Sequence, residues 1–301
     1  MTEISILVCT RNRAASLRRT LDALVAALAE RPAVTGELVV VDNGSTDATP
    51  ALLREVASAA PVPVRVVEES RPGLAVARNA GLRACQGRLI VMMDDDCIPA
   101  PGYLDDVLRH AAADAAPVLR GGRVVLGDPQ DLRFTVKDHD HAHRLQPGGH
   151  PAMVVLGCNM VLPRAIVDAV GPFDERFGAG APLLAAEDTD YVYRTFRAGF
   201  AVEYVPDMTV LHFHGRRRKE EIAELERRYV FGNGAFNAKW AFRDMKMARD
   251  LLWTLRQSVN PWRRRVVLRA EYDLTWGDTL DQTLRGAAET YHMALHHLKP
   301  R

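Results

Sequence analysis

Three consecutive aspartates, Asp94, Asp95 and Asp96, directly follow an apolar run over residues 89–93. The run is short and rich in residues that favour strands, so it predicts a buried strand that ends in three carboxylates. Carboxylates this close repel one another unless a cation lies among them, and hard divalent ions such as Mg²⁺ and Mn²⁺ prefer carboxylate oxygens. The cluster therefore predicts a metal site; an acidic loop with its side chains in water is the alternative.

Two further polar clusters directly follow predicted strands. The strand over residues 4–8 is followed by Thr10, Arg11, Asn12 and Arg13, and the strand over residues 37–41 by Asp42, Asn43, Gly44 and Ser45. In open α/β sheets, ligands bind at the carboxyl ends of the strands. The three polar clusters are therefore expected to meet at one edge of one sheet.

The elements that must position these clusters follow from the spacing of apolar residues. The first hundred residues predict strands over 4–8, 37–41, 64–67 and 89–93, and helices over 14–29, 47–58 and 73–85, with Asp47 available to cap the second helix. Three strand–helix units in succession require parallel strands joined by right-handed crossovers. The predicted fold class is therefore α/β, with a Rossmann-like sheet flanked by helices.

The rest of the chain has a less regular pattern. It predicts helices over 103–113 and 184–198, strands over 118–126, 154–162, 202–205 and 209–213, and a long loop over 127–150. From Lys219 to about Leu298 the pattern is mostly helical. Gly232-Asn233-Gly234 resembles the start of a dinucleotide fingerprint, but no strand precedes it and the third glycine is missing, which favours a helix kink or close packing.

Two more carboxylates, Glu187 and Asp188, lie near the start of the predicted helix over 184–198. Acidic residues in a first helical turn interact favourably with the helix dipole, so capping alone would account for them. One of them could also act as a general base for an acceptor hydroxyl, because negative charge nearby, such as Asp190, raises the pKa of a carboxyl group. The residues themselves leave both interpretations open.

Histidines and arginines supply further candidates. His212 and His214 alternate, which puts them on one side of a strand, and neutral imidazole is a common metal ligand; a polar strand end is the alternative. Asp42 is a candidate to accept hydrogen bonds from a nucleobase. Four arginines are candidates to offset phosphate charge, with a solvated surface role as the alternative: Arg11, Arg13, Arg71 and Arg78.

Taken together, these motifs resemble those of the family 2 glycosyltransferases, which have the GT-A fold. The resemblance covers about residues 4–214, and an ordered set of motifs is far more specific than any single one. The motifs are Cys9-Thr10-Arg11-Asn12-Arg13, Val41–Asp47, Gly73–Gly81, Asp94-Asp95-Asp96 as the metal-binding DXD signature, and Glu187-Asp188 as the ED motif.

The resemblance implies transfer of a sugar, with inversion at its anomeric carbon, from a nucleoside-diphosphate sugar to an acceptor hydroxyl. UDP or dTDP is the expected nucleotide, and the acceptor is a glycan, a lipid-linked molecule or a small molecule. Mg²⁺ or Mn²⁺ is expected as the cofactor, with Asp94, Asp96 and His212 as ligands and His214 as the rival of His212. Asp188 is expected to be the catalytic base, with Glu187 beside it. The expected donor-binding residues are Thr10, Arg11, Arg13, Asp42, Asn43, Arg78, Asp94 and Asp95.

The same resemblance implies separate roles for three parts of the chain. Residues 1–100 would form the nucleotide-binding half and residues 101–214 the acceptor-binding half of a GT-A domain, with residues 215–301 as a helical C-terminal extension. The abundance of alanine and arginine indicates a bacterial protein. Polysaccharide, glycolipid or specialised-metabolite biosynthesis is the pathway that we predict from this origin.

The bulk composition is that of a globular protein with one large or two modest domains. The chain has 301 residues, of which 48% are hydrophobic and 26% charged. No apolar segment approaches bilayer-spanning length, and the N-terminus has no features of a signal peptide. The four cysteines, Cys9, Cys85, Cys97 and Cys158, have no paired spacing, which favours reduced thiols in the cytoplasm.

Charge is distributed unevenly along the chain. Residues 1–214 have a net charge of −6, whereas residues 215–301 contain 18 Lys and Arg against 11 Asp and Glu, a net charge of +7. Mixed basic and aromatic residues are typical of an interfacial helix, so peripheral contact of 215–301 with the inner face of the cell membrane is one prediction. A helical cap or a homo-oligomer contact is the alternative, and no nucleic-acid partner is expected. The residues concerned are Trp253, Arg256, Trp262, Arg263, Arg264, Arg265 and Arg269.

Two other functions are alternatives to glycosyl transfer. A sugar-phosphate nucleotidyltransferase also combines a Rossmann-like sheet with carboxylate-bound magnesium. It needs to bind a triphosphate, commonly through a glycine-rich basic loop near the first strand, and residues 10–13 contain no glycine. A non-catalytic subunit that keeps the fold is the other alternative, and the intact aspartate triplet and Glu187-Asp188 pair argue against it.

Overall fold

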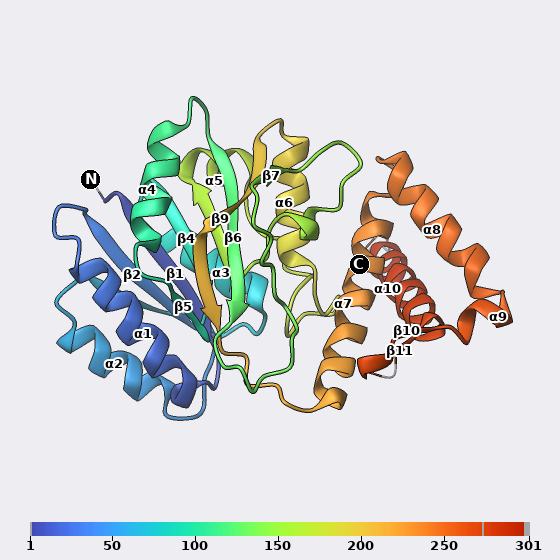
Figure 1. Ribbon diagram of the computed structural model, residues 1–301, viewed down its shortest axis with the longest axis horizontal. Coiled ribbons are helices and arrows are strands. Elements are labelled where there is room, and N and C mark those ends of the chain that lie inside the picture. Colours follow the sequence, from blue (N-terminus) through green and yellow to red (C-terminus); the bar gives the residue numbers. More distant parts are fainter. Residues whose placement is uncertain (1, 273, 298–301) are drawn as a thin grey trace. The chain divides into compact units, whose positions relative to one another are not determined.

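The computed structural model of the chain describes residues 2–272 and 274–297 (Figure 1). Two compact units are present, and the boundary passes between Glu187 and Asp188. The first unit contains the residues up to Asp174 together with Asp188–Gly215. The second unit contains Glu175–Glu187 and the described residues from Arg216 onward. The predicted helix end near Leu298 lies outside the described residues.

The first unit contains a mixed sheet with helices on both faces, which confirms the predicted fold class. In the described part of the chain, nine strands form this sheet in the order β3-β2-β1-β4-β8-β6-β9-β5, with β7 paired to β9. The strands are β1 (Ile4–Thr10), β2 (Gly36–Asp42), β3 (Val64–Glu68), β4 (Leu89–Asp94), β5 (Cys97–Pro99), β6 (Val118–Leu126), β7 (His143–Arg144), β8 (Asn159–Pro163) and β9 (Ala201–His212). The helices are α1 (Ala14–Ala29), α2 (Thr49–Ala59), α3 (Leu74–Ala84), α4 (Tyr103–Ala113), α5 (Arg164–Val170) and α6 (Glu187–Arg197).

The alternating apolar pattern of the strands produces two cores, one on each face of the sheet. In β1, Ile4, Ile6 and Val8 face a core that also contains residues of α1, α2 and α4, whereas Leu7 faces a core with residues of α3, α5 and α6. Successive side chains of a strand point to opposite faces, so a strand that is apolar throughout must be covered on both. Strands β3, β2, β1 and β4 are parallel, as the strand–helix repeats predict.

Several predicted boundaries were wrong. The predicted strand over 154–162 is shorter, because residues 154–158 form turns with one isolated bridge, and β8 begins only at Asn159. The helix predicted from residue 184 begins at Glu187, since Leu184 and Ala186 have φ angles of 61° and 70°. The two short strands over 202–205 and 209–213 are one strand, β9, whose register against β6 shifts between Gly122 and Arg123. Asp47, the predicted cap of the second helix, accepts a hydrogen bond from the Thr49 backbone N–H, and α2 begins at Thr49.

The second unit is mostly helical, as predicted. It contains α7 (Lys219–Trp240), α8 (Met245–Ser258), α9 (Pro261–Arg264) and α10 (Trp276–His297), with β10 (Val267–Arg269) and β11 (Leu274–Thr275) as an antiparallel pair. The backbones of α7 and α10 approach closely: a Cβ at Gly234 would clash with Thr283, and one at Gly286 with Phe231. Gly232 and Gly234 thus serve helix packing and not nucleotide binding. Among the described residues, no helix is long and apolar enough to cross a bilayer.

Candidate active site

The ends of β1, β2 and β4 lie side by side, as the three polar clusters require. Thr10 is paired in register with Asp42, and Cys9 with Asp94. These parallel strands deliver Arg11–Arg13, Asp42–Asn43 and Asp94–Asp96 to one edge of the sheet. The predicted convergence of the clusters is therefore confirmed.

Arg13 and Thr10 hold the aspartate triplet in place. Arg13 Nη2 lies 2.6 Å from Asp96 Oδ2, and Arg13 Nε lies 3.4 Å from Asp95 Oδ1. The Thr10 hydroxyl donates to Asp95 Oδ2 at 2.7 Å. One guanidinium thus shares its charge between two of the three carboxylates.

Burial makes it unfavourable for Asp94 and Asp95 of the triplet to be ionised. Burial raises the pKa of Asp95 to about 6, although Arg13 and Thr10 act in the opposite direction. Burial also raises the pKa of Asp94, which the charges of Asp96 and Asp188 raise further while Arg78 and His212 lower it. Burial, with like charges nearby, thus disfavours the ionised carboxylates of this site, and a bound cation would relieve that cost.

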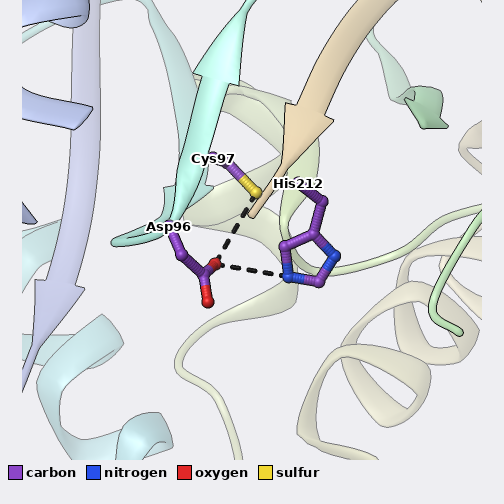
Figure 2. Close-up of side chains that lie close together, drawn as sticks. All are labelled: Asp96, Cys97 and His212. Atoms are coloured by element: carbon purple, nitrogen blue, oxygen red, sulfur yellow. Dashed lines mark hydrogen bonds and ion pairs between the residues drawn. The ribbon is translucent and has the colours of Figure 1, made fainter. Parts of the chain in front are cut away.

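Asp96 and His212 are two potential metal ligands whose side chains point toward each other (Figure 2). His212 Nε2, from the end of β9, lies 3.3 Å from Asp96 Oδ1, and both side chains are buried. The Cys97 thiol lies 4.0 Å from the same oxygen. A contact with Cys158, together with burial, raises the pKa of the Cys97 thiol. A neutral thiol is a poor ligand for a hard ion, so Asp96 and His212 are the better donors.

A second interaction orients the His212 ring. Its Nδ1 lies 3.1 Å from the Thr135 hydroxyl, and Thr135 has an unfavourable φ of 50° for a β-branched residue. Burial lowers the pKa of His212, but the hydrogen bond to Asp96 and nearby negative charge outweigh it and raise the pKa to about 9. His214 instead lies 3.8 Å from Asp131 and 3.1 Å from the Leu132 carbonyl. Of the two histidines, the geometry favours His212 as the ligand.

Asp188 belongs to the same cluster as the aspartate triplet. Its Oδ2 accepts a hydrogen bond from the Gly157 backbone N–H at 2.8 Å, and its Oδ1 accepts one from the Thr189 N–H at 2.6 Å. A Cβ at Gly157 would lie 2.9 Å from Arg78 Nη2 and 3.0 Å from Asp188 Oδ2. The buried Arg78 in turn lies 3.4 Å from Asp94 Oδ1. Arg78 and Gly157 therefore connect the two sets of carboxylates.

Glu187 precedes this cluster at the first position of α6. It is buried, and a Cβ at Gly178 would lie 3.1 Å from Glu187 Oε2. Leu184 and Ala186 have left-handed backbone conformations directly before it. Such conformations are costly for residues with side chains and are concentrated near functional sites.

Comparison with known proteins identifies the family. The sequence profile described as "Glycosyl transferase family 2" matches residues 5–171, and the profile "Glycosyl transferase family group 2" matches residues 89–277. The chain belongs to glycosyl transferase family 2. It is therefore an enzyme of the glycosyltransferase class with a GT-A fold.

Individual relatives of this glycosyltransferase are distant. Glycosyltransferase AglE of Haloferax volcanii is 23% identical over 256 residues, which cover 84% of this chain and 80% of AglE. A validoxylamine A glucosyltransferase of Streptomyces hygroscopicus subsp. jinggangensis is 35% identical, over 65% of this chain but only 52% of the relative. The solved structure of mannosyltransferase PcManGT from Pyrobaculum calidifontis, in complex with GDP-Man and Mn²⁺, has a TM-score of 0.63 at 21% identity, covering 96% of this chain and 87% of that one.

The other predicted donor-site residues of the glycosyltransferase differ in how many of their polar groups already have partners within the protein. Asp42 Oδ1 accepts from the Ser45 N–H at 2.9 Å and orders the turn after β2. Asn43 donates to the carbonyls of Glu69 and Arg71 and accepts from the Gly73 N–H, so its amide positions the start of α3. Arg11 is exposed, and no residue in the described part of the chain forms an ion pair with it. Asp42 and Arg11 thus have more capacity for a ligand than Asn43.

The loop over 127–150 of this glycosyltransferase contributes a residue that sequence reasoning missed. Lys137 is buried, and its Nζ donates to the Ala152 carbonyl at 3.1 Å, the one hydrogen bond that it makes to the described residues. Burial lowers the pKa of Lys137 to about 8, although the negative charge of Asp188 acts in the opposite direction. A polar loop without periodicity gives no signal for such a residue. Gly157 was also missed, because it was assigned to the interior of a strand.

Proposed function

We propose that this glycosyltransferase moves a sugar from a nucleoside-diphosphate sugar to an acceptor hydroxyl with inversion, with the help of one divalent ion. The observation that supports this most directly is the connection of Asp94–Asp96 and Asp188 through Arg78 and Gly157. A donor diphosphate and an acceptor hydroxyl can then react between the two sets of carboxylates.

The donor atoms of the cluster fit a hard divalent ion. Asp96 and His212 supply an oxygen and a nitrogen that lie close together, and Asp94 adds a carboxylate whose pKa is raised by burial. When bound, Mg²⁺ or Mn²⁺ would neutralise charge on the diphosphate leaving group. The solved complex of PcManGT contains Mn²⁺ with GDP-Man, in agreement with this assignment.

The chain's own residues would carry the remaining steps. Asp188 accepts the proton of the acceptor hydroxyl as the hydroxyl oxygen bonds to the anomeric carbon, and the bond from that carbon to the diphosphate breaks on the opposite face. The nucleoside diphosphate leaves with the bonding electrons. Arg11, Arg13 and Arg78 offset phosphate charge, Thr10 and Asp95 support the diphosphate site, and Asp42 and Asn43 serve the nucleoside.

Lys137 is the residue that we place nearest the acceptor. Its ammonium group interacts electrostatically with Asp188, and two of its three N–H donors are without a partner among the described residues. A buried cation with spare donors suits a substrate hydroxyl or anionic group. The acceptor-binding role of residues 101–214, and the nucleotide-binding role of residues 1–100, are part of this proposal.

The nucleotide is proposed to be UDP or dTDP, and the pathway bacterial polysaccharide, glycolipid or specialised-metabolite biosynthesis in the cytoplasm. Family membership favours sugar transfer over the nucleotidyltransferase and non-catalytic alternatives. A panel of UDP-, dTDP- and GDP-sugars with Mn²⁺, read by thermal shift and then by nucleotide release, tests the donor class. Release of pyrophosphate from a nucleoside triphosphate would instead favour the nucleotidyltransferase.

The proposed base has a direct test. Asp188→Asn can keep the hydrogen bond from Gly157 through its one carbonyl oxygen, at the loss of the bond from Thr189, but it cannot accept the acceptor proton. We therefore expect kcat to fall by roughly 10²–10⁴-fold. Asp22→Asn, on the exposed face of α1, is the matched control and is expected to leave kcat unchanged. Unchanged transfer by Asp188→Asn at saturating donor would remove Asp188 as the base.

A further inference from the structure

One face of α8 is apolar and exposed. Met245, Leu252 and Val259 are spaced seven residues apart and are 77%, 65% and 77% exposed, and Leu255 between them is 54% exposed. Residues at this spacing lie on one face of a helix. Met247 and Thr254, also seven apart, are buried on another face. The helix therefore packs through one face and presents a second apolar face to solvent.

The apolar surface continues beyond α8. Trp262 is 80% exposed, and Val266, Val267 and Leu268 are 49%, 56% and 42% exposed. Trp262 is held in this position by a capped turn, because Asn260 Oδ1 accepts hydrogen bonds from the N–H groups of Trp262 and Arg263. We refer to the exposed residues of 245–269 as the amphipathic face.

Basic residues are interleaved with the apolar ones. Arg249, Arg256 and Arg263 repeat with the same spacing of seven, each four residues after Met245, Leu252 and Val259 respectively. Residues 242–269 contain eight Lys and Arg but only two Asp and no Glu, a net charge of +6. Arg249, Arg256, Arg263 and Arg265 are exposed and form no ion pair with the described residues, whereas Arg264 is paired with Asp281.

We propose that the amphipathic face binds the surface of an anionic phospholipid bilayer. Apolar and aromatic side chains would enter the boundary between head groups and acyl chains, while the arginines contact lipid phosphates. A second copy of the chain fits less well, because two copies of the segment over 242–269, each with a net charge of +6, would be brought together. Nucleic acid offers no apolar partner for Leu252, Leu255 and Val259. The proposal rests on the second unit alone and does not depend on the proposed function.

Co-sedimentation with vesicles tests the proposal. The purified full chain is expected to bind phosphatidylcholine vesicles that contain phosphatidylglycerol, to bind pure phosphatidylcholine vesicles much more weakly, and to dissociate as salt is raised. Arg256→Gln with Arg263→Gln is expected to weaken binding to the anionic vesicles roughly 25-fold, since each basic residue near such a surface contributes about fivefold.

Two controls make the result specific. Arg54→Gln with Arg83→Gln removes two equally exposed arginines of the first unit and is expected to leave vesicle binding unchanged. Leu252→Ser with Leu255→Ser removes apolar side chains without changing charge, and is expected to reduce binding while the thermal unfolding temperature stays within a few degrees.

Three outcomes would overturn the proposal. One is absence of binding to anionic vesicles at low salt, and another is equal loss of binding in the two arginine double variants. The third is a concentration-dependent dimer, seen by analytical ultracentrifugation, that the two leucine substitutions abolish; it would assign the face to a second copy of the chain.

Discussion

Replacing Lys137 with methionine is expected to stabilise the protein while it impairs sugar transfer. Burial lowers the pKa of Lys137 from 10.5 to about 8, so holding this side chain charged at neutral pH costs about 3 kcal/mol. Methionine has a similar length and no charge. Loss of the hydrogen bond to the Ala152 carbonyl offsets about 1 kcal/mol of the gain. The expected net stabilisation at pH 7 is about 2 kcal/mol.

The pH dependence of stability provides an independent check. In the unfolded chain Lys137 keeps its proton up to about pH 10.5, whereas in the folded protein it loses the proton near pH 8. Between these values the unfolded state binds more protons, so the stability that Lys137 contributes rises with pH. The free energy of unfolding of Lys137→Met should therefore exceed that of the unsubstituted protein below pH 8, and the difference should shrink as pH approaches 10.5.

Urea unfolding at a series of pH values measures the change in stability, and steady-state kinetics measure the change in sugar transfer. If Lys137 hydrogen-bonds the acceptor, kcat/KM for the acceptor should fall roughly 10–100-fold, with KM for the donor unchanged. Lys219→Met, at an exposed position of α7, is the matched control and should change neither quantity. Destabilisation by Lys137→Met that does not vary with pH would refute the reasoning, because Lys137 would then be a structural anchor for the Ala152 carbonyl.

Three further predictions concern the same cluster. Gly157→Ala should lower kcat by roughly 10²-fold, because the added Cβ would displace Arg78 and Asp188. Gly149→Ala is the control: its Cβ would meet loop atoms at 3.0 Å, and kcat should not change. Equal kcat values for the two variants would contradict the assigned role of Gly157. His212→Gln should weaken Mn²⁺ binding, measured by calorimetry, more than about 10-fold and more than His214→Gln does; the reverse order would make His214 the ligand. Thr135→Val keeps the branched shape but removes the hydroxyl next to His212 Nδ1, so Mn²⁺ affinity should fall by about 10-fold, and an unchanged affinity would exclude this orienting role.

The sequence predicted the structure correctly where an apolar pattern was compatible with only one type of element. Strands β1, β2 and β4 are apolar on both faces and end in polar clusters, so both their parallel arrangement and the convergence of their ends could be predicted. The apolar run over 154–162 contains no comparable boundary signal. Its first part, residues 154–158, forms turns, and these bring the Gly157 N–H to Asp188. Periodicity cannot distinguish such a turn from a buried strand.

Residues that the sequence could not place lie in strained or irregular backbone. Leu184-Ala185-Ala186 consists of good helix formers, which is why the helix was predicted to start at residue 184. The positive φ angles of Leu184 and Ala186 show that tertiary structure overrides this preference directly before Glu187. Thr135 and Lys137 lie in a polar loop that has no apolar repeat. The sequence therefore gives no sign that Thr135 contacts His212, or that Lys137 is buried and interacts electrostatically with Asp188.

Several positions where the sequence-based predictions failed coincide with strained backbone. Among the described residues, the non-glycine residues with left-handed φ are Asn12, Thr135, Leu184 and Ala186. Asn12 follows β1 in the predicted donor site, Thr135 contacts His212, and the other two directly precede the Glu187-Asp188 pair. Each such conformation costs on the order of 1–3 kcal/mol and persists only where the surrounding fold determines it. Local preference is thus overridden directly beside residues of the proposed site, and a map of backbone strain would have indicated this region without any motif.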